Sequence, residues 1–343
     1  EDLDITNFFI EVAFPSEKEV LQVIEALDLA KKDLSIRDLQ ELINLGTKRI
    51  KQILMLLGLE SPAPVVKVSS TWTRTAAPLN KEFLKRANRL TALRKKEQAQ
   101  MQEYVDLKEG HMAFLVESLD GVAEAMAPSE CESLEIELCE DLVREADKFL
   151  NTLHLPIEPR EEWPNEGMPR MGVNGAIPAE MRNQVGRALC LYGFRKLGKL
   201  VEQGKYKDER FDEDLVIACT DLVKKWKPEV EWVCGIPSLR KPELVSGFCE
   251  QLASKLQIPY LPALIGVERR REQKEMQNPT QKARNVDGAM AIDSSLVFPK
   301  GPVLLVDDMV ASRWTLTVAG WLLKQAGVED VYPMALAQAG DGS

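Results

Sequence analysis

The 343-residue sequence is poor in the residue patterns that bind metals and nucleotides. It has 2 histidines and 6 cysteines, and no two cysteines form the CxxC pair that marks a structural zinc site. The phosphate-binding pattern GxxxxGKS/T is absent, so this chain is not expected to hydrolyse ATP. No apolar run approaches the roughly 18 residues of a membrane span, and no signal peptide is visible. We therefore expect a cytoplasmic chain with free thiols and no membrane partner.

Positive charge is scarce in only one part of the chain. The net charge is −10. Residues 1–110 contain 17 basic (Lys or Arg) and 17 acidic (Asp or Glu) residues, and residues 181–343 contain 23 basic and 21 acidic ones. Residues 111–180, by contrast, contain 4 basic and 16 acidic residues. The acidity therefore belongs to the middle segment, and the overall sign does not exclude a nucleic-acid partner. The chain starts at Glu1 and not at Met, from which we expect a fragment of a longer protein.

The most informative stretch is VLLVDDMVASRWTLTVA, residues 303–319. Its first four residues are an apolar run typical of a strand buried on both faces of a parallel sheet. Two acidic residues, Asp307 and Asp308, follow at the carboxyl end, where open α/β sheets place their ligands. A short loop then leads to a helix that we expect to begin at Thr315 and stop at Gly327. Such an arrangement can hold a sugar diol on the acids and a phosphate at the helix N-terminus.

This stretch resembles the phosphoribosyltransferase fingerprint, and from about Glu231 onward the chain is similar to the ComF-type branch of that superfamily. The superfamily usually has two small residues, mostly glycines, where this chain has Arg313 and Trp314. We expect these bulky side chains to fill the space of the phosphate, so the fold is retained and the transferase activity is lost, with no catalytic residue. The resemblance implies a vestigial ribose-phosphate site made of Asp307, Asp308, Ser312, Arg313, Trp314, Thr315, Ser238 and Arg240.

The first 78 residues carry the pattern of a winged-helix domain. An extended apolar strip is expected over 1–15, and Ser16, Ser35 and Thr47 are expected to begin three short helices. The β-rich stretch VVKVSSTWTRT then suits a hairpin wing. Near the start of the third helix, Lys48, Arg49 and Lys51 are candidates for contact with DNA phosphates. A solvated face, or a protein-interaction role for the domain, is an equal alternative.

A long basic helix is predicted over 79–108. Arg86, Arg89 and Arg94 lie among its basic residues and are further candidates for binding a phosphate backbone. They are equally consistent with the solvent-exposed face of an amphipathic helix that binds no ligand.

The order of these elements, with FFI and AFP before the helices and W-x-R-T after them, is similar to the region that follows the motor of RecQ-like DNA helicases. The closest branch is the RqlH type, in which a phosphoribosyltransferase-like domain is fused at the C-terminus. That family carries a four-cysteine zinc site after the long helix, and the matching candidates here are His111, Cys131 and Cys139. Only three nitrogen or sulfur ligands remain where closed zinc needs four, which favours a degenerate, metal-free site over an occupied one.

Two other stretches complete the pattern. Residues 151–182 are rich in proline and glycine and are predicted to wrap the next domain as a linker, followed by helices at about 183–203 and 212–226. Residues 266–285 form a polar insertion between two strand-like runs. Its basic residues suggest a clamp for nucleic acid, whereas its interleaved glutamates suggest a salt-bridged helix without a ligand. The clamp candidates are Arg269, Arg270, Arg271 and Lys274.

We therefore expect a multidomain chain: a mostly helical N-terminal half, with a winged helix over 1–78 and a helical segment over 79–155, and an α/β domain with a parallel sheet over 156–343. The expected function is that of an accessory region of an ATP-dependent RecQ-like helicase, which binds single-stranded or forked DNA and forms homo-oligomers. No cofactor is expected in this fragment, since ATP and Mg²⁺ belong to the absent motor. The alternatives are an active phosphoribosyltransferase and a domain that binds phosphoribosyl diphosphate for regulation.

Overall fold

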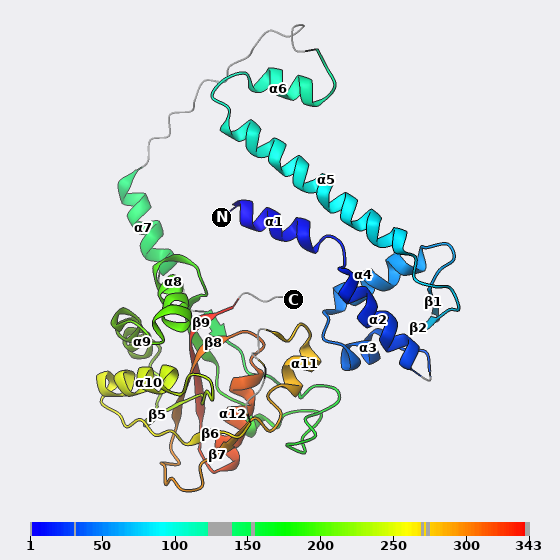
Figure 1. Ribbon diagram of the computed structural model, residues 1–343. Helices are drawn as coiled ribbons and strands as arrows, with labels where there is room; N and C mark the ends of the chain where they lie inside the picture. The colour runs from blue at the N-terminus through cyan, green and yellow to red at the C-terminus, as the bar shows by residue number, and fades with distance from the viewer. Residues whose placement is uncertain are drawn as a thin grey trace. The chain divides into compact units, whose positions relative to one another are not determined.

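The computed structural model describes residues 2–30, 32–122, 139–151, 155–268, 271 and 275–339. The chain divides into two compact units, 1–138 and 139–343, each of which is considered by itself. Over its described residues the first unit is helical apart from one hairpin, and the second is built on a five-stranded mixed sheet (Figure 1). This confirms the coarse fold class. The division at 78 and 155 stays a prediction.

Three helices of the first unit surround a common core, as the sequence predicted. They are α2 (Glu17–Leu29), α3 (Ile36–Leu42) and α4 (Thr47–Gly58). Ser16 and Ser35 both begin their helices with a capping box, in which the serine and an acidic residue three positions later bond each other's backbone amides. The apolar residues of each helix recur every three or four positions and face inward, with Leu39, Ile50 and Leu54 fully buried.

A hairpin follows the three helices, formed by β1 (Val65–Val68) and β2 (Thr71–Arg74) in antiparallel register. Its turn contains Ser69, which adopts the left-handed backbone conformation at φ 57°. Trp72 of β2 also exchanges two backbone hydrogen bonds with Leu34, in the segment between α2 and α3, at 3.0 and 2.8 Å. The hairpin is thereby joined to a third short extended segment and covers the helical core.

The extended strip predicted over 1–15 is wrong, since residues Asp2–Val12 form helix α1. No proline or glycine interrupts this stretch before Pro15, so nothing in it prevents helix formation, and the helix is held by α5 (Lys81–Asp106). The contact includes an ion pair between Glu11 and Lys95 at 3.1 Å. The predicted long helix is confirmed as α5, and a short helix, α6 (His111–Ser118), follows it.

The sheet of the second unit has the strand order β3-β4-β9-β8-β5. Four neighbouring strands run parallel, and the edge strand β3 pairs antiparallel with β4, so the sheet is mixed and not parallel throughout. The strands are β3 (Leu155–Ile157), β4 (Gly186–Leu191), β5 (Trp232–Gly235), β8 (Val303–Val310) and β9 (Val331–Gln338).

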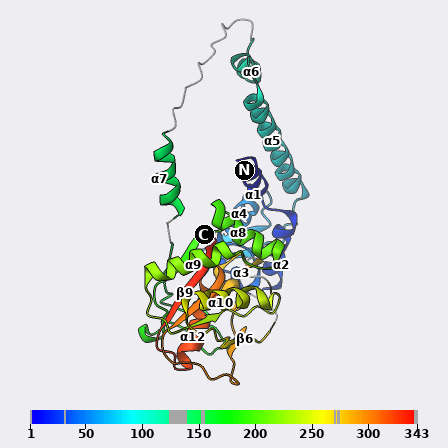
Figure 2. The same cartoon turned by 90° about the vertical axis from the view of Figure 1, so that its left-hand side faces the viewer.

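Helices cover both faces of this sheet and create two cores. On one face lie α8 (Arg195–Gln203), α9 (Glu213–Trp226) and α10 (Pro242–Leu256), and on the other lies α12 (Trp314–Gln325). Figures 1 and 2 show α9 and α10 on the opposite side of the strands from α12. Alternate residues of β8 serve the two cores: Val303 and Leu305 belong to the α12 side, Leu304 and Val306 to the other.

Two sequence predictions need correction here. Residues 186–191 of the predicted helix 183–203 form strand β4, because this short apolar run between glycines pairs with β9 in the middle of the sheet. Residues 151–182 are more than a linker: the segment contains β3 and buries Trp163, Met168 and Ile177 in the α12-side core. Its contribution to this core was not predicted from the sequence.

The remaining elements are short. Helix α7 (Glu140–Asn151) precedes β3, a 3-10 turn covers Ala179–Met181, and a π-helical turn covers Gly204–Asp208. The insertion predicted between two strand-like runs is confirmed, since β6 (Leu264–Gly266) and β7 (Met290–Ile292) pair antiparallel on either side of it. Helix α11 (Pro279–Arg284) lies within the insertion.

Candidate functional site

The two acidic residues lie on β8 at the point where the neighbouring strand β5 ends. Strand β5 pairs with β8 only as far as Val306, and the backbone amide of Ile236 then donates to the Val306 carbonyl at 2.8 Å. Strand β8 itself continues past Val306 to Val310, because β9 pairs with it along its length. The sequence had predicted that this strand would end at Val306. Asp307 and Asp308 are thus fixed on a regular strand at the carboxyl edge of the sheet.

Asp307 is buried and is held in a low-dielectric environment. Burial and, secondarily, the charge of Asp308 raise the pKa of Asp307 to about 8, against the opposing influence of Lys205. One of its carboxylate oxygens accepts the backbone amide of Asp308 at 2.8 Å. At neutral pH this carboxyl group therefore keeps its proton for much of the time.

Asp308 forms an ion pair with Lys205, a residue that the sequence did not single out. The Nζ of Lys205 lies 2.8 Å from Oδ2 of Asp308, and the two side chains are 24% and 14% exposed. Burial alone would lower the pKa of Lys205, but the charges of Asp308 and Asp307 raise it. Lys205 stands between the two helices predicted at about 183–203 and 212–226, and no local pattern identified its partner 103 positions away.

The loop after β8 is closed by contacts within the chain. Arg313 has a left-handed backbone at φ 66°, and its Nη1 donates to the carbonyl of Glu158 at 3.1 Å. Helix α12 then begins at Trp314, one residue before the predicted start, and Thr315 lies in its first turn. Arg313 and Glu158 thereby tie the loop to the segment that follows β3.

The prediction that Trp314 fills the space of a phosphate is wrong. Trp314 is only 3% exposed and lies in the core, because its position on the helix puts it on the same inward face as Val318 four residues later. Its ring is stacked with that of Trp163, with centroids 6.3 Å apart and planes 11° apart. The indole belongs to the domain interior and not to a ligand site.

Arg160, which the sequence analysis did not single out, contacts both Trp314 and the loop before it. Its guanidinium carbon lies 3.7 Å from the centre of the Trp314 ring, and its Nε and Nη2 both donate to the carbonyl of Ser312, at 2.9 and 2.7 Å. Burial, followed by the charge of Arg313, lowers the pKa of Arg160 to about 10. Ser312 is therefore used as an acceptor within the fold. Arg160 stands in a proline-rich stretch far from the loop in sequence, which explains why no pattern linked the two.

The β5–α10 loop contributes the other predicted site residues. Ser238 Oγ accepts the backbone amide of Lys241 at 3.2 Å, which folds the loop onto the start of α10. The Nζ of Lys241 donates to the carbonyl of Lys205 at 2.6 Å and pairs with Glu209 at 3.0 Å. Arg240 is exposed. Ser238 and Lys241 thus shape the loop that anchors the backbone of Lys205, the partner of Asp308.

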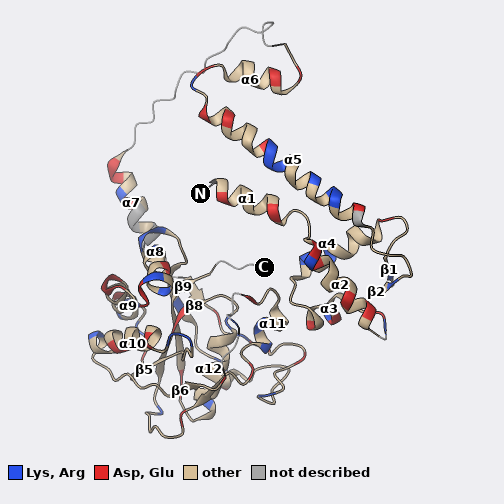
Figure 3. Ribbon diagram, viewed as in Figure 1, with Lys and Arg blue, Asp and Glu red and all other residues tan. Residues whose placement is uncertain are grey.

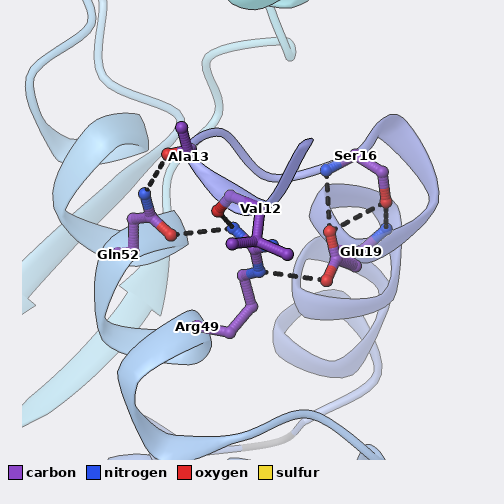
Figure 4. Close-up of polar contacts among 6 residues, drawn as sticks. All are labelled: Val12, Ala13, Ser16, Glu19, Arg49 and Gln52. Atoms are coloured by element: carbon purple, nitrogen blue, oxygen red, sulfur yellow. Dashed lines mark hydrogen bonds and ion pairs between the residues drawn. The ribbon is translucent and has the colours of Figure 1, made fainter. Parts of the chain in front are cut away.

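Among the DNA-contact candidates of α4, Arg49 is committed to the protein itself. Its Nε lies 3.1 Å from Glu19, and its Nη1 donates to the Val12 carbonyl at 2.8 Å and to Gln52 at 2.9 Å (Figure 4). Arg49 therefore has a structural role, in which it joins α4 to the α1–α2 connection, and it is not a candidate for contact with phosphate. Lys48 and Lys51 are exposed on the same helix and stay candidates.

Basic residues follow α5 along much of its length (Figure 3). Arg86 pairs with Glu60, and Arg94 pairs with Glu97 one turn later at 2.9 Å. Arg89 is exposed. Both paired arginines remain more than half exposed, so these surface pairs hold them only weakly.

The predicted metal and clamp sites fall largely outside the described residues. Cys131, Arg269, Arg270 and Lys274 lie outside them, Cys139 is exposed, and Arg271 is exposed. His111 begins α6, with its ring packed edge-to-face against that of Tyr104 at 5.1 Å. Over the ranges that the structure describes, no three histidine, cysteine, aspartate or glutamate side chains are grouped so as to hold a metal ion.

Comparison with known proteins gives a limited result. No protein-family profile matches the chain, and no curated protein does. Four chains of solved structures match, among them adenine phosphoribosyltransferase from Leishmania donovani, at 21% identity and a TM-score of 0.25. That match takes in 37% of this chain and 54% of the enzyme, so it spans about half of that protein's length. The chain is thus weakly and partly similar to a phosphoribosyltransferase. In the described ranges no helix combines the length and apolar character needed to cross a bilayer.

Proposed function

We propose that this chain is the accessory region of a RecQ-like helicase of the RqlH type, and that its N-terminal unit binds DNA as a winged helix. The proposal rests chiefly on one observation: Lys48 and Lys51 are exposed at the start of α4, while Arg49 between them is turned into the fold. A helix that presents cations at its N-terminal end, beside a β-hairpin, has the form of a groove-binding recognition element.

The chain order supports the same reading. Helix α2, the extended segment at Leu34, helices α3 and α4 and the hairpin follow one another as in a winged helix, with Leu34 bonded to Trp72. The hairpin carries Lys67, which is exposed on β1. Exposed cations on α4, on the hairpin and on α5 would bind the phosphate backbone of single-stranded or forked DNA. The parent motor would supply ATP and Mg²⁺, and assembly into homo-oligomers is part of the proposal.

In this proposal the C-terminal unit is a phosphoribosyltransferase-type fold without transferase activity. Ser312 and Arg313 are engaged by Arg160 and Glu158, and Asp308 is engaged by Lys205. A phosphate that used Arg313 would have to replace the Glu158 carbonyl, and a sugar diol that used Asp308 would have to displace Lys205. The alternative, a unit that binds or transfers phosphoribosyl groups, is favoured only by the position of the two carboxylates at the edge of the sheet.

Fluorescence anisotropy with labelled single-stranded, duplex and forked DNA tests the proposal, in a salt series and with or without phosphoribosyl diphosphate. We expect affinity to fall steeply with salt and to ignore the sugar phosphate. Lys51→Glu should weaken binding, whereas Lys224→Glu on α9 changes the net charge equally at an exposed position and should not. Equal loss in both variants would mean that only the overall charge matters. Saturable binding of phosphoribosyl diphosphate without DNA binding would establish the alternative.

A further inference from the structure

The carboxylates at the edge of the sheet already have a cation from the chain itself. The Lys205 ammonium lies 2.8 Å from Asp308, and its Nζ also lies 3.4 Å from the sulfur of Met309 on the same strand. Both members of the ion pair are mostly withdrawn from solvent, at 24% and 14% exposed. An ion pair in this setting is screened less than one on the open surface, so the ammonium is held firmly beside the Asp308 carboxylate.

The backbone around Lys205 is fixed on both sides. Gly204 precedes it, and a Cβ at that position would come within 2.8 Å of both the Arg210 carbonyl and the Phe211 ring, so the turn closes tightly only with glycine. After it, Lys241 holds the turn by donating to the Lys205 carbonyl at 2.6 Å and pairing with Glu209 at 3.0 Å. The lysine is therefore delivered to Asp308 by a π-helical turn anchored to the β5–α10 loop.

We propose that Lys205 is an internal counter-ion that closes the Asp307–Asp308 pair to divalent cations and to sugar diols. A divalent cation needs a negatively charged carboxylate, and since Asp307 is largely protonated at neutral pH, that charge comes from Asp308, which the ammonium neutralises at Oδ2. A diol needs the same carboxylate oxygens as acceptors. The contact is autoinhibitory, since any ligand of this edge must first displace Lys205. It does not depend on DNA binding by the N-terminal unit.

The test compares Mn²⁺ binding by the wild-type chain with binding by Lys205→Met, followed by electron paramagnetic resonance of free Mn²⁺ and by calorimetry with Mg²⁺ and ribose 5-phosphate. We expect Lys205→Met to bind Mn²⁺ about tenfold or more tightly than the wild type, since a unit charge beside the site is removed. Adding Asp308→Asn to that variant should abolish the gain. Lys207→Met is the matched control: it removes an exposed lysine from the same turn and should behave as the wild type.

Circular dichroism and thermal unfolding show whether each variant is folded, and Lys205→Gln serves as a second variant that keeps a hydrogen-bonding side chain. Equal Mn²⁺ affinity in the wild type and in the folded Lys205 variants would overturn the proposal. So would a gain in Lys205→Met that survives Asp308→Asn, because the cation would then bind elsewhere. Neither result would alter the anisotropy experiment, so failure here is distinguishable from failure of the proposed DNA binding.

Discussion

Replacing Arg49 with alanine separates a structural role from DNA contact. The substitution removes the ion pair to Glu19 and the hydrogen bonds to the Val12 carbonyl and Gln52. Arg49 is only 17% exposed, so water replaces these bonds incompletely. Glu19 still accepts hydrogen bonds from the amide and the hydroxyl of Ser16, at 2.7 and 2.9 Å. Its carboxylate is therefore not left without a partner, which limits the loss of folding stability. The expected destabilisation is about 2 kcal/mol.

Such a loss lowers the midpoint of thermal unfolding by roughly 5 to 10 °C for a unit of this size. We would follow unfolding by circular dichroism and DNA affinity by anisotropy, at a temperature where both proteins are folded. Arg49→Ala should then bind DNA within about twofold of the wild type, whereas Lys51→Ala should unfold normally and reduce the slope of log affinity against log salt by about 1. Arg49→Lys keeps the charge but not the planar fork, so it should recover only part of the stability.

One pattern of results would refute this reasoning. If Arg49→Ala unfolds within about 1 °C of the wild type yet loses DNA binding as Lys51→Ala does, the internal contacts carry little energy and Arg49 contacts DNA directly. Loss of both properties in both variants would show that the lysine, too, is structural.

Two further predictions concern the second unit. Burial raises the pKa of Asp307 to about 8, so the folded chain retains a proton that the unfolded chain releases near its ordinary value of 3.8. The free energy of unfolding should therefore fall as pH rises between about 4 and 8. Asp307→Asn should flatten this pH dependence, as measured by urea unfolding. If the pH dependence is the same in the variant, the Asp307 carboxyl group is ionised in the folded chain. Trp314→Ala removes an indole packed between Trp163 and Arg160 and should cost about 4 kcal/mol in the same assay, and a cost under about 1 kcal/mol would contradict the burial of this ring.

The elements with strong local patterns were predictable. The serines that begin α2 and α3, the inward spacing of Ile50 and Leu54, and the strand-to-helix run from Val303 to Gly327 all follow from periodicity and capping. Strand β4 was mistaken for helix because its pairing with β9 joins residues almost 150 positions apart, and pairing at that distance leaves no local pattern.

The site was predictable only where it lies on consecutive residues. Asp307 and Asp308 were found because they end an apolar run. Lys205 and Arg160 reach the same edge of the sheet from 103 and 152 residues away, and neither stands in a pattern that names its partner. Trp314 was placed in the loop because its neighbours suggested a phosphate site, whereas its spacing from Val318 already indicated an inward face.

The position of β9 governs how this sheet can be made. It lies between β4 and β8 and pairs with both, although it follows every other strand that the structure describes. During synthesis the earlier strands therefore emerge with open edges, and the two halves of the sheet cannot join until residues 331–338 have left the ribosome. Until then β4 and β8 each present an unpaired edge, the kind of edge along which strands of different chains can pair.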